Sequence, residues 1–452
     1  MNEKKDLKNN KSSKKKMITY GSARLGSSIV LGIEGFALFN LYYVGFGVPA
    51  LLVTSAQALG YLIIGFGQFL MGSVSDAKYT KWGRRKPYIM IFTPVLAISF
   101  IALLLPSLFL PNLNDKLLLF GWFLLWDALF KIGYSMTTVY QAWMPEQFEV
   151  NSRPKVSQYQ NYFNYIGNGI MLVMSMLILT SYVNQLEKNI NSPIPMDFLI
   201  SVITFGIIVI VTYYLIMFLM PVEPYMKIET NLIENIKSTV KNKNFMLVII
   251  MIGLSSLGWS IITDVMLTYT QVVLNFDTTE YIIAALCLVL GIFFFINLWR
   301  KSIEKRGKKP TLLYILLFAV IFLPLTLLGL FTIAVNLVFG IIFILGIAVM
   351  LGGWGLFPYI IYADLAEDDE KSSGNLKAGV YTGFPSIILN AFQAFGVMIL
   401  GVAIDSLPEI TVGELTYSMG LVLWGPICSV ILLVSYLYTR KFIKLDFEWE
   451  KS

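Results

Sequence analysis

The chain has 452 residues, of which 56% are hydrophobic and 14% are charged, and its formal net charge is +6. Soluble globular domains usually carry about 25% charged residues, so this composition excludes an ordinary soluble protein. Histidine is absent and both cysteines lie in apolar stretches, which excludes an imidazole proton relay and a disulfide framework and leaves no metal-ligand cluster.

Apolar stretches long enough to cross a bilayer recur along most of the chain. Because about 20 apolar residues span the membrane as a helix, we predict an all-α membrane protein with twelve transmembrane helices. A membrane β-barrel would instead show short alternating segments. The predicted spans are 24–47, 50–75, 87–109, 117–144, 158–183, 197–220, 245–274, 280–300, 310–330, 335–363, 379–405 and 414–440.

Residues 1–23 are predicted to form a basic cytoplasmic tail. Of the 34 Lys and Arg, 31 fall in this tail, in the loops that follow even-numbered spans, or in the C-terminal tail. Because positive charge marks the cytoplasmic face, both termini are expected in the cytoplasm of a multi-pass cell-membrane protein. The first apolar stretch lacks a small-residue cleavage site, which argues against a cleavable signal peptide.

The first two spans carry polar groups that lipid would not tolerate. Glu34 lies in span one, and an ionisable residue inside the membrane is a functional candidate by default. Span two carries a stripe of polar side chains, Gln57, Tyr61, Gln68 and Ser75. Both features are expected to face the interior of the bundle.

A short basic hairpin separates spans two and three. It runs from Asp76 to Pro87 and holds five Lys and Arg. An echo, residues 305–310, follows span eight almost half a chain length later, which predicts a transporter built from two parallel repeats. The first hairpin is expected to act as a gating clasp that pairs in one conformation and releases in the other. Its predicted members are Asp76, Gly83, Arg84, Arg85 and Lys86.

Spans four and five carry further polar stripes. Asp127 and Lys131 are four residues apart, so they share a helix face and are expected to pair. The same face continues through Tyr134, Thr138 and Gln141. Span five presents Asn161, Asn164, Tyr165 and Asn168. The alternative interpretation of Asp127 and Lys131 is a structural ion pair that locks the helix.

The second half repeats this organisation. Residues 221–244 form the longest polar connection and are interpreted as a linker between an N-terminal bundle, 24–220, and a C-terminal bundle, 245–440, with 441–452 as a tail. Asp264 lies on span seven, which is equivalent to span one in a six-plus-six repeat. Asp264 and Glu34 are therefore expected to face one cavity from opposite halves. Desolvation there favours the protonated carboxyl, so either residue is a candidate proton carrier.

The remaining candidates are uncharged. Trp259 precedes Asp264 on span seven, and span eleven carries Thr382, Ser386, Asn390 and Gln393. Amides and hydroxyls beside aromatic rings suit a polyhydroxylated substrate, whose apolar C–H faces stack on the rings. The alternative is that these amides bind neighbouring helices together. An acidic cluster in residues 364–370 is interpreted as a solvated cytoplasmic face.

The segments Gly72 to Asp76 and Trp82 to Pro87 resemble the loop-two signature of the major facilitator superfamily. More narrowly, they resemble the glycoside–pentoside–hexuronide:cation symporters and the related plant sucrose transporters, as do Tyr20-Gly21 and the stretch 364–383. The resemblance implies two six-helix bundles, alternating access, a sugar bound at the midplane and coupling to a cation.

The sequence departs from the melibiose permease pattern at the positions that the resemblance makes important. Ile64 and Gln68 stand where that pattern has paired span-two aspartates. The pattern's aspartates on spans one and four align with Ser28 and Thr137, and its lysine on span eleven aligns near Leu389. A sodium site of that type is therefore not expected, and proton coupling through Glu34, Asp127 or Asp264 is favoured over uncoupled facilitation.

These observations predict a secondary active transporter for a glycoside or small oligosaccharide, driven by protons. We expect a monomer in the bilayer with a small-molecule sugar as partner, no nucleic acid and no cofactor besides the coupling H⁺. The sequence shows no pair of a nucleophile and a base that would indicate an enzyme, so we do not expect one. Two alternatives stay open: a transporter of another solute, such as a lysolipid or organic anion, and a non-transporting receptor or sensor.

Overall fold

A computed structural model describes residues 14–77, 79–149, 152–223, 240–357, 361 and 378–445. Within these ranges it contains 12 helices long and apolar enough to cross a membrane. This number confirms the prediction of an all-α membrane protein with twelve spans. The predicted acidic cluster at 364–370, Thr382, most of the 221–244 linker and the ends of both tails lie outside the described residues or side chains.

Six spans make up the N-terminal half. Several are built from more than one helical segment, because short π-helical or 3₁₀ turns interrupt them. The segments are α2 (Lys14–Asn40) with η1 (Leu41–Gly45), α3 (Ala50–Ala77), α4 (Lys86–Leu104) with η2 (Pro106–Leu108), α5 (Lys116–Tyr134) with α6 (Met136–Gln147), α7 (Arg153–Val173) with η4 (Met174–Leu179) and α8 (Thr180–Lys188), and α9 (Met196–Leu219).

The C-terminal half repeats the pattern and adds a small hairpin. Its segments are α11 (Lys243–Thr268) with η5 (Tyr269–Val273), α12 (Thr278–Arg306), α13 (Lys308–Phe322) with η6 (Leu323–Leu330) and η7 (Thr332–Val335), α14 (Leu337–Trp354), α16 (Ala378–Ser406), β1 (Glu409–Val412), β2 (Leu415–Ser418) and α17 (Gly420–Phe442).

The first helix begins ten residues earlier than the sequence predicted, at Lys14 instead of residue 24. The added turns are held by side chains that apolar length alone does not reveal. The rings of Tyr20 and Tyr140 stack with centroids 4.6 Å apart, and each hydroxyl donates to the other residue's carbonyl oxygen. This packing extends the helix beyond the apolar stretch into the basic tail.

The last helix begins later than predicted, at Gly420 instead of residue 414. The preceding residues form the antiparallel pair β1 and β2, with Val412 opposite Leu415. Gly413 forms the turn at φ 63°, a conformation that glycine adopts readily. The Tyr417 hydroxyl anchors the hairpin by donating to the carbonyl oxygen of Gly329.

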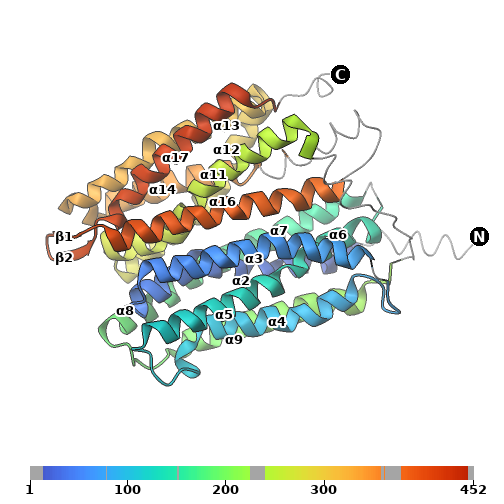
Figure 1. Ribbon diagram of the computed structural model, residues 1–452, viewed down its shortest axis with the longest axis horizontal. Helices are drawn as coiled ribbons and strands as arrows, with labels where there is room; N and C mark the ends of the chain where they lie inside the picture. Colours follow the sequence, from blue (N-terminus) through green and yellow to red (C-terminus); the bar gives the residue numbers. More distant parts are fainter. Residues whose placement is uncertain are drawn as a thin grey trace, which may run out of the picture.

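The two halves lie side by side and meet chiefly along α3 and α16, which run together through the middle of the molecule (Figure 1). Helices α2 and α11 also pack against each other across this junction. The halves share local detail: α2 and α11 both end in a π-helical turn, and Gly83 and Gly307 both have φ 88° in the hairpins after α3 and α12. These correspondences agree with two parallel repeats.

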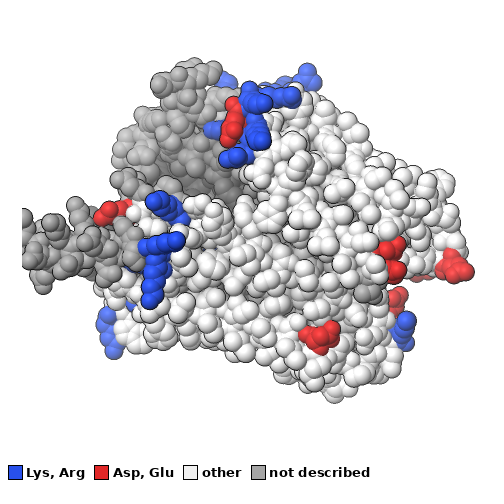
Figure 2. Space-filling model, turned by 180° about the vertical axis from the view of Figure 1, so that it is seen from behind, with Lys and Arg blue, Asp and Glu red and all other residues white. Residues whose placement is uncertain are grey.

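The outer surface is apolar around the middle of the helices. Figure 2 shows one face on which charged side chains gather toward the two ends of the molecule, with an uncharged belt between them. The large apolar side chains exposed on the surface include Phe218, Leu290 and Ile321. Such a belt is the expected surface of helices that face lipid.

Candidate functional site

A buried ion pair lies between α2 and α5. Lys131 Nζ donates to Glu34 Oε2 at 2.7 Å, and both side chains are almost fully buried. The ammonium also sits 4.8 Å from the centre of the Tyr61 ring on α3. Three helices of the N-terminal half therefore contact the Lys131 ammonium. A buried lysine needs such partners if it is to stay charged.

Asp127 lies one helical turn before Lys131 but does not form the expected ion pair with it. Within the described residues no donor group bonds either buried carboxylate oxygen of Asp127, although the Glu34 carboxyl group lies within hydrogen-bonding reach. Lys131 takes Glu34 as its partner instead. Asp127 still interacts electrostatically with both groups. Helical spacing gave the correct face, but the partner came from another helix.

Asp264 brings a third carboxyl group from the C-terminal half. It is fully buried on α11, and within the described structure neither of its oxygens has a hydrogen-bond partner. It interacts electrostatically with Glu34, Lys131 and Asp127 across the junction between the halves. Glu34 and Asp264 therefore come within electrostatic range of each other from opposite halves, and that they face one cavity stays a prediction.

The four groups form what we call the charge cluster: Glu34, Asp127, Lys131 and Asp264. It holds three carboxyl groups and one ammonium in a buried, low-dielectric setting. Full ionisation would leave two uncompensated negative charges, which is costly away from water. The cluster is therefore suited to hold a proton. Gly60 makes room for it, because a Cβ there would overlap the Asp127 carboxylate.

Residues close in sequence to Glu34 and Asp264 border open space or carry aromatic rings. A Cβ added at Gly35, next to Glu34, would meet nothing within 4 Å, so α2 borders open space at this point. On α11, the Trp259 ring stacks on Trp354 of α14 with centroids 5.7 Å apart. The indole Nε1 of Trp259 is buried and has no acceptor among the described residues. A free buried donor beside a ring platform suits a hydroxylated ligand.

The amide residues divide between free and bridging groups. Gln57 is buried on α3, and its Oε1 has no donor within the described part of the chain. Gln68 instead accepts a hydrogen bond from Ser386 of α16 at 2.6 Å, and Asn390 donates back to the Ser386 carbonyl oxygen. The Gln393 carbonyl oxygen accepts from Ser260 of α11. The Gln68 amide therefore joins two helices, as the alternative interpretation proposed, whereas the Asn390 amide bonds within α16.

Two members of the polar stripes on spans four and five, Gln141 and Asn161, are not part of the charge cluster. Gln141 and Asn161 are exposed, toward the Lys- and Arg-rich ends of their helices. Asn164 is half-buried and accepts a hydrogen bond from Ser28 of α2 at 2.6 Å. The structure thus does not bring Gln141 or Asn161 together with the charged groups.

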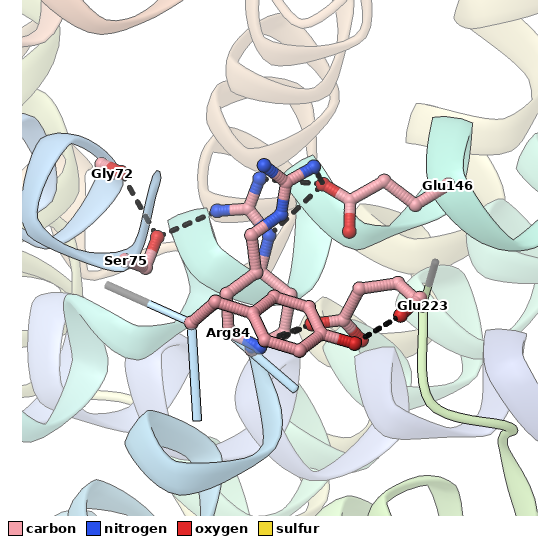
Figure 3. Close-up of polar contacts among 7 residues, drawn as sticks. Gly72, Ser75, Arg84, Glu146 and Glu223 are labelled. Carbon is pink, nitrogen blue, oxygen red and sulfur yellow. Dashed lines mark hydrogen bonds and ion pairs between the residues drawn. The ribbon is translucent and has the colours of Figure 1, made fainter. Parts of the chain in front are cut away.

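The basic hairpin forms a clasp at one end of the N-terminal half (Figure 3). Arg84 and Arg85 are buried, and each directs its guanidinium at the same Glu146 oxygen, at 2.8 Å and 2.6 Å. Arg85 also donates to Ser75 at 2.6 Å, and Lys86 donates to the Met220 carbonyl oxygen. The loop is therefore tied to α3, α6 and the end of α9.

Glu223 completes this clasp from the start of the central linker. Its Oε1 accepts hydrogen bonds from the backbone N–H groups of Arg84 and Arg85, and its carbonyl oxygen accepts from Tyr79. Gly83 is required here, because a Cβ would lie 2.8 Å from the Glu223 Cδ and its φ is 88°. The Asp76 side chain, predicted to take part, lies outside the described side chains.

Sequence reasoning missed Glu146 and Glu223. Both are acids at the ends of spans on the face where most Lys and Arg gather, and that position was the available signal. Arginines that become buried need acidic partners, so the acids nearest to the hairpin in neighbouring loops were the natural candidates.

The family model for MFS/sugar transport proteins matches residues 18–424. The chain belongs to this family. It is thus a major facilitator, a multi-pass membrane transporter of the secondary type, and its family and fold are those of transporters rather than enzymes.

Individual relatives are more distant. An uncharacterized symporter of Synechocystis sp., sll1374, is 25% identical over 164 residues, which are 36% of this transporter and 30% of the relative. The transporter therefore matches less than a third of that relative's length.

Solved structures share the fold over nearly the whole chain. The D-xylose-proton symporter aligns with a TM-score of 0.64 at 14% identity, covering 95% of this chain and 97% of that one. The nucleoside transporter NupG aligns at 0.62 and 12%, covering 94% and 99%. The inward-open xylose transporter XylE from E. coli aligns at 0.60 and 12%, covering 96% of each. At such identities these likenesses establish the fold.

Proposed function

We propose that this transporter carries a glycoside or small oligosaccharide and couples its movement to protons. The observation that carries the proposal is the charge cluster, in which three buried carboxyl groups face one lysine. A site with this excess of acid is stable when it holds a proton and strained when it does not. Proton binding can therefore be linked to which arrangement of the two halves is favoured.

The division of the cluster between the halves suggests how coupling works. Glu34, Asp127 and Lys131 belong to the N-terminal half and move together, whereas Asp264 belongs to the C-terminal half. When the halves close around the cluster, the carboxyl groups repel and Asp264 is favoured in its protonated form. When the halves separate and water enters, Asp264 can release the proton. Each cycle would then move one proton with the substrate.

The sugar assignment rests on the family description and on the groups beside the cluster. The stacked Trp259 and Trp354 offer an aromatic platform, while Trp259 Nε1 and Gln57 Oε1 are a donor and an acceptor with no described protein partner. A polyhydroxylated ring can satisfy both atoms and lay an apolar face on the indoles.

We further propose that the Lys- and Arg-rich end, which carries the clasp, faces the cytoplasm. The distribution of 34 Lys and Arg supports this orientation, because positive loops stay on the cytoplasmic side. A reporter fused after residue 445 that is active only in the cytoplasm would test it.

Counterflow of a labelled panel into proteoliposomes tests the proposed activity. The panel holds mono- and disaccharides, nucleosides and a lysophospholipid, each measured with and without an inward proton gradient. We expect exchange of one sugar and its uphill accumulation only when the gradient is imposed. Exchange of the nucleoside or lysophospholipid, without any sugar, would overturn the substrate assignment. Exchange of a sugar that ignores the gradient would overturn proton coupling.

A further inference from the structure

Helix α3 begins without a capping residue of its own. Pro49 precedes Ala50, and the first turn of α3 contains no acidic residue. The free N–H groups are taken instead by Asp405 near the end of α16: Ala50 N donates to Oδ1 at 3.0 Å and Leu51 N donates to Oδ2 at 2.7 Å. One carboxylate of the C-terminal half therefore caps a helix of the N-terminal half.

The equivalent helix of the other half is capped differently. Helix α12, the second span of the C-terminal half, has its own cap in Asp277, which accepts from Glu280 N at 2.8 Å. The Glu280 carboxylate in turn accepts a hydrogen bond from the Asp277 backbone N–H. This cap stays within one segment and does not depend on how the halves sit. The two repeats thus differ in whether the cap is local or supplied by the opposite half.

Other contacts at the same end also join the halves. Asn40, at the end of α2, donates to Gln271 of η5 at 2.7 Å and accepts from Thr268 at 3.0 Å. Farther into the membrane, α3 and α16 pack so closely that a Cβ at Gly401 would overlap the Thr54 hydroxyl. Thr54 is fully buried in this junction. The end that carries Asp405 is therefore closed.

We propose that Asp405 is a positioning residue that latches this end of the transporter shut by capping α3 across the junction. Opening this end requires α3 and α16 to separate, which strips two N–H groups and the positive end of the helix dipole of their carboxylate. The latch therefore sets the equilibrium between the state closed at this end and the state open at it. The inference rests on alternating access and not on the identity of the substrate.

Loss of the carboxylate favours the open state by an amount that a capping interaction predicts. Removing a side-chain cap changes an equilibrium by up to roughly thirtyfold, and a change of about fivefold is typical. The remaining contacts, such as that between Asn40 and Gln271, are unaffected by the substitution. We therefore expect a shifted equilibrium in a folded protein and not a collapsed junction.

Accessibility of a buried cysteine measures this equilibrium directly. Thr54→Cys places a thiol in the closed junction, in a background where Cys287 and Cys428 are replaced by serine. The labelling rate with a polar maleimide is measured on the purified full chain in detergent, without substrate. We expect Asp405→Ala to raise the labelling rate about fivefold. The matched control is Asp277→Ala, which removes the local cap of α12 and is expected to leave the rate unchanged.

Two results would overturn the latch. One is an unchanged rate in Asp405→Ala, and the other is an equal rise in Asp277→Ala, which would mark a general loss of stability. Asp405→Asn keeps one acceptor oxygen without the charge, so its rate should fall between parent and Asp405→Ala. If Asp405→Ala does not fold, the Asn variant alone decides, and a parental rate in it contradicts the proposal. Because no substrate is used, failure of the sugar assignment leaves this test intact.

Discussion

Lys131 and Glu34 form an ion pair, 2.7 Å between Nζ and Oε2, across two helices of the same half. Since α2 and α5 belong to one bundle, the pair is kept when the bundles rock against each other. In the proposed transport cycle, Asp264, on the opposite bundle, is the member of the charge cluster whose distance to the others changes. The ion pair therefore holds the site together, whereas the position of Asp264 depends on how the two bundles are arranged.

Replacing Lys131 by Met should strongly destabilise the protein. It leaves Glu34, Asp127 and Asp264 buried without a positive partner, and breaking a buried pair in this way costs about 3–5 kcal/mol. Protonation of the orphan carboxyls relieves the repulsion, so the loss should be larger at pH 8 than at pH 5. Thermal unfolding in detergent at both pH values measures this.

The exposed Lys188 provides the control for that change, and Lys188→Met should leave the midpoint unaltered. In the double variant Glu34→Gln, Lys131→Met both charges of the pair are gone, and part of the stability should return. A single variant as stable as the parent at pH 8 would contradict the importance of the ion pair.

Glu146→Gln should loosen the clasp. The substitution leaves Arg84 and Arg85 buried without their shared carboxylate, at a cost of about 3 kcal/mol. Thermal melting should show the loss, while Glu149→Gln, at an exposed acid three residues later, should melt like the parent. Equal midpoints for both variants would mean that the guanidinium groups find other partners.

Gly83→Ala should destabilise the same loop by another route. An alanine at φ 88° costs about 1–2 kcal/mol, and its Cβ would also press on the Glu223 carboxylate. In a Glu223→Ala background the second contribution disappears, so the loss on adding Gly83→Ala should be smaller there. Purely additive effects of the two substitutions on melting would show that Glu223 does not contact this turn.

Trp259→Phe should weaken substrate binding without unfolding the protein. The smaller ring keeps part of the stacking on Trp354 but loses the Nε1 donor, so we expect the half-saturation concentration to rise about tenfold. Trp143, buried on α6 against Lys86 of the clasp, gives the matched control, and Trp143→Phe should leave half-saturation unchanged. The reverse pattern would move the substrate site toward α6.

The span count could be predicted because it depends on a local property of the chain. Apolar length sets the number of spans. Helical spacing put Asp127 and Lys131 on one face, but it carries no information about which helix lies opposite. The partner of Lys131 is Glu34, 97 residues away. Contacts of this kind depend on how helices pack, and one sequence does not reveal that.

The helix ends were the least predictable part of the fold. At the start, Tyr20 and Tyr140 extend α2 through packing 120 residues apart. At the end, β1 and β2 replace the expected first turn of the last span. The capping of α3 by Asp405 of the other half could not be predicted either, since Asp405 lies 355 residues from Ala50.

Uptake by Asp264→Asn tests the central claim most directly. Proteoliposomes carrying the parent, Asp264→Asn or the control Asp277→Asn are compared for sugar counterflow and for uphill accumulation under an inward proton gradient. The account predicts that Asp264→Asn keeps counterflow but no longer accumulates sugar, while the control behaves like the parent. Gradient-driven accumulation by Asp264→Asn at the parental level would contradict the assignment of Asp264 to proton coupling.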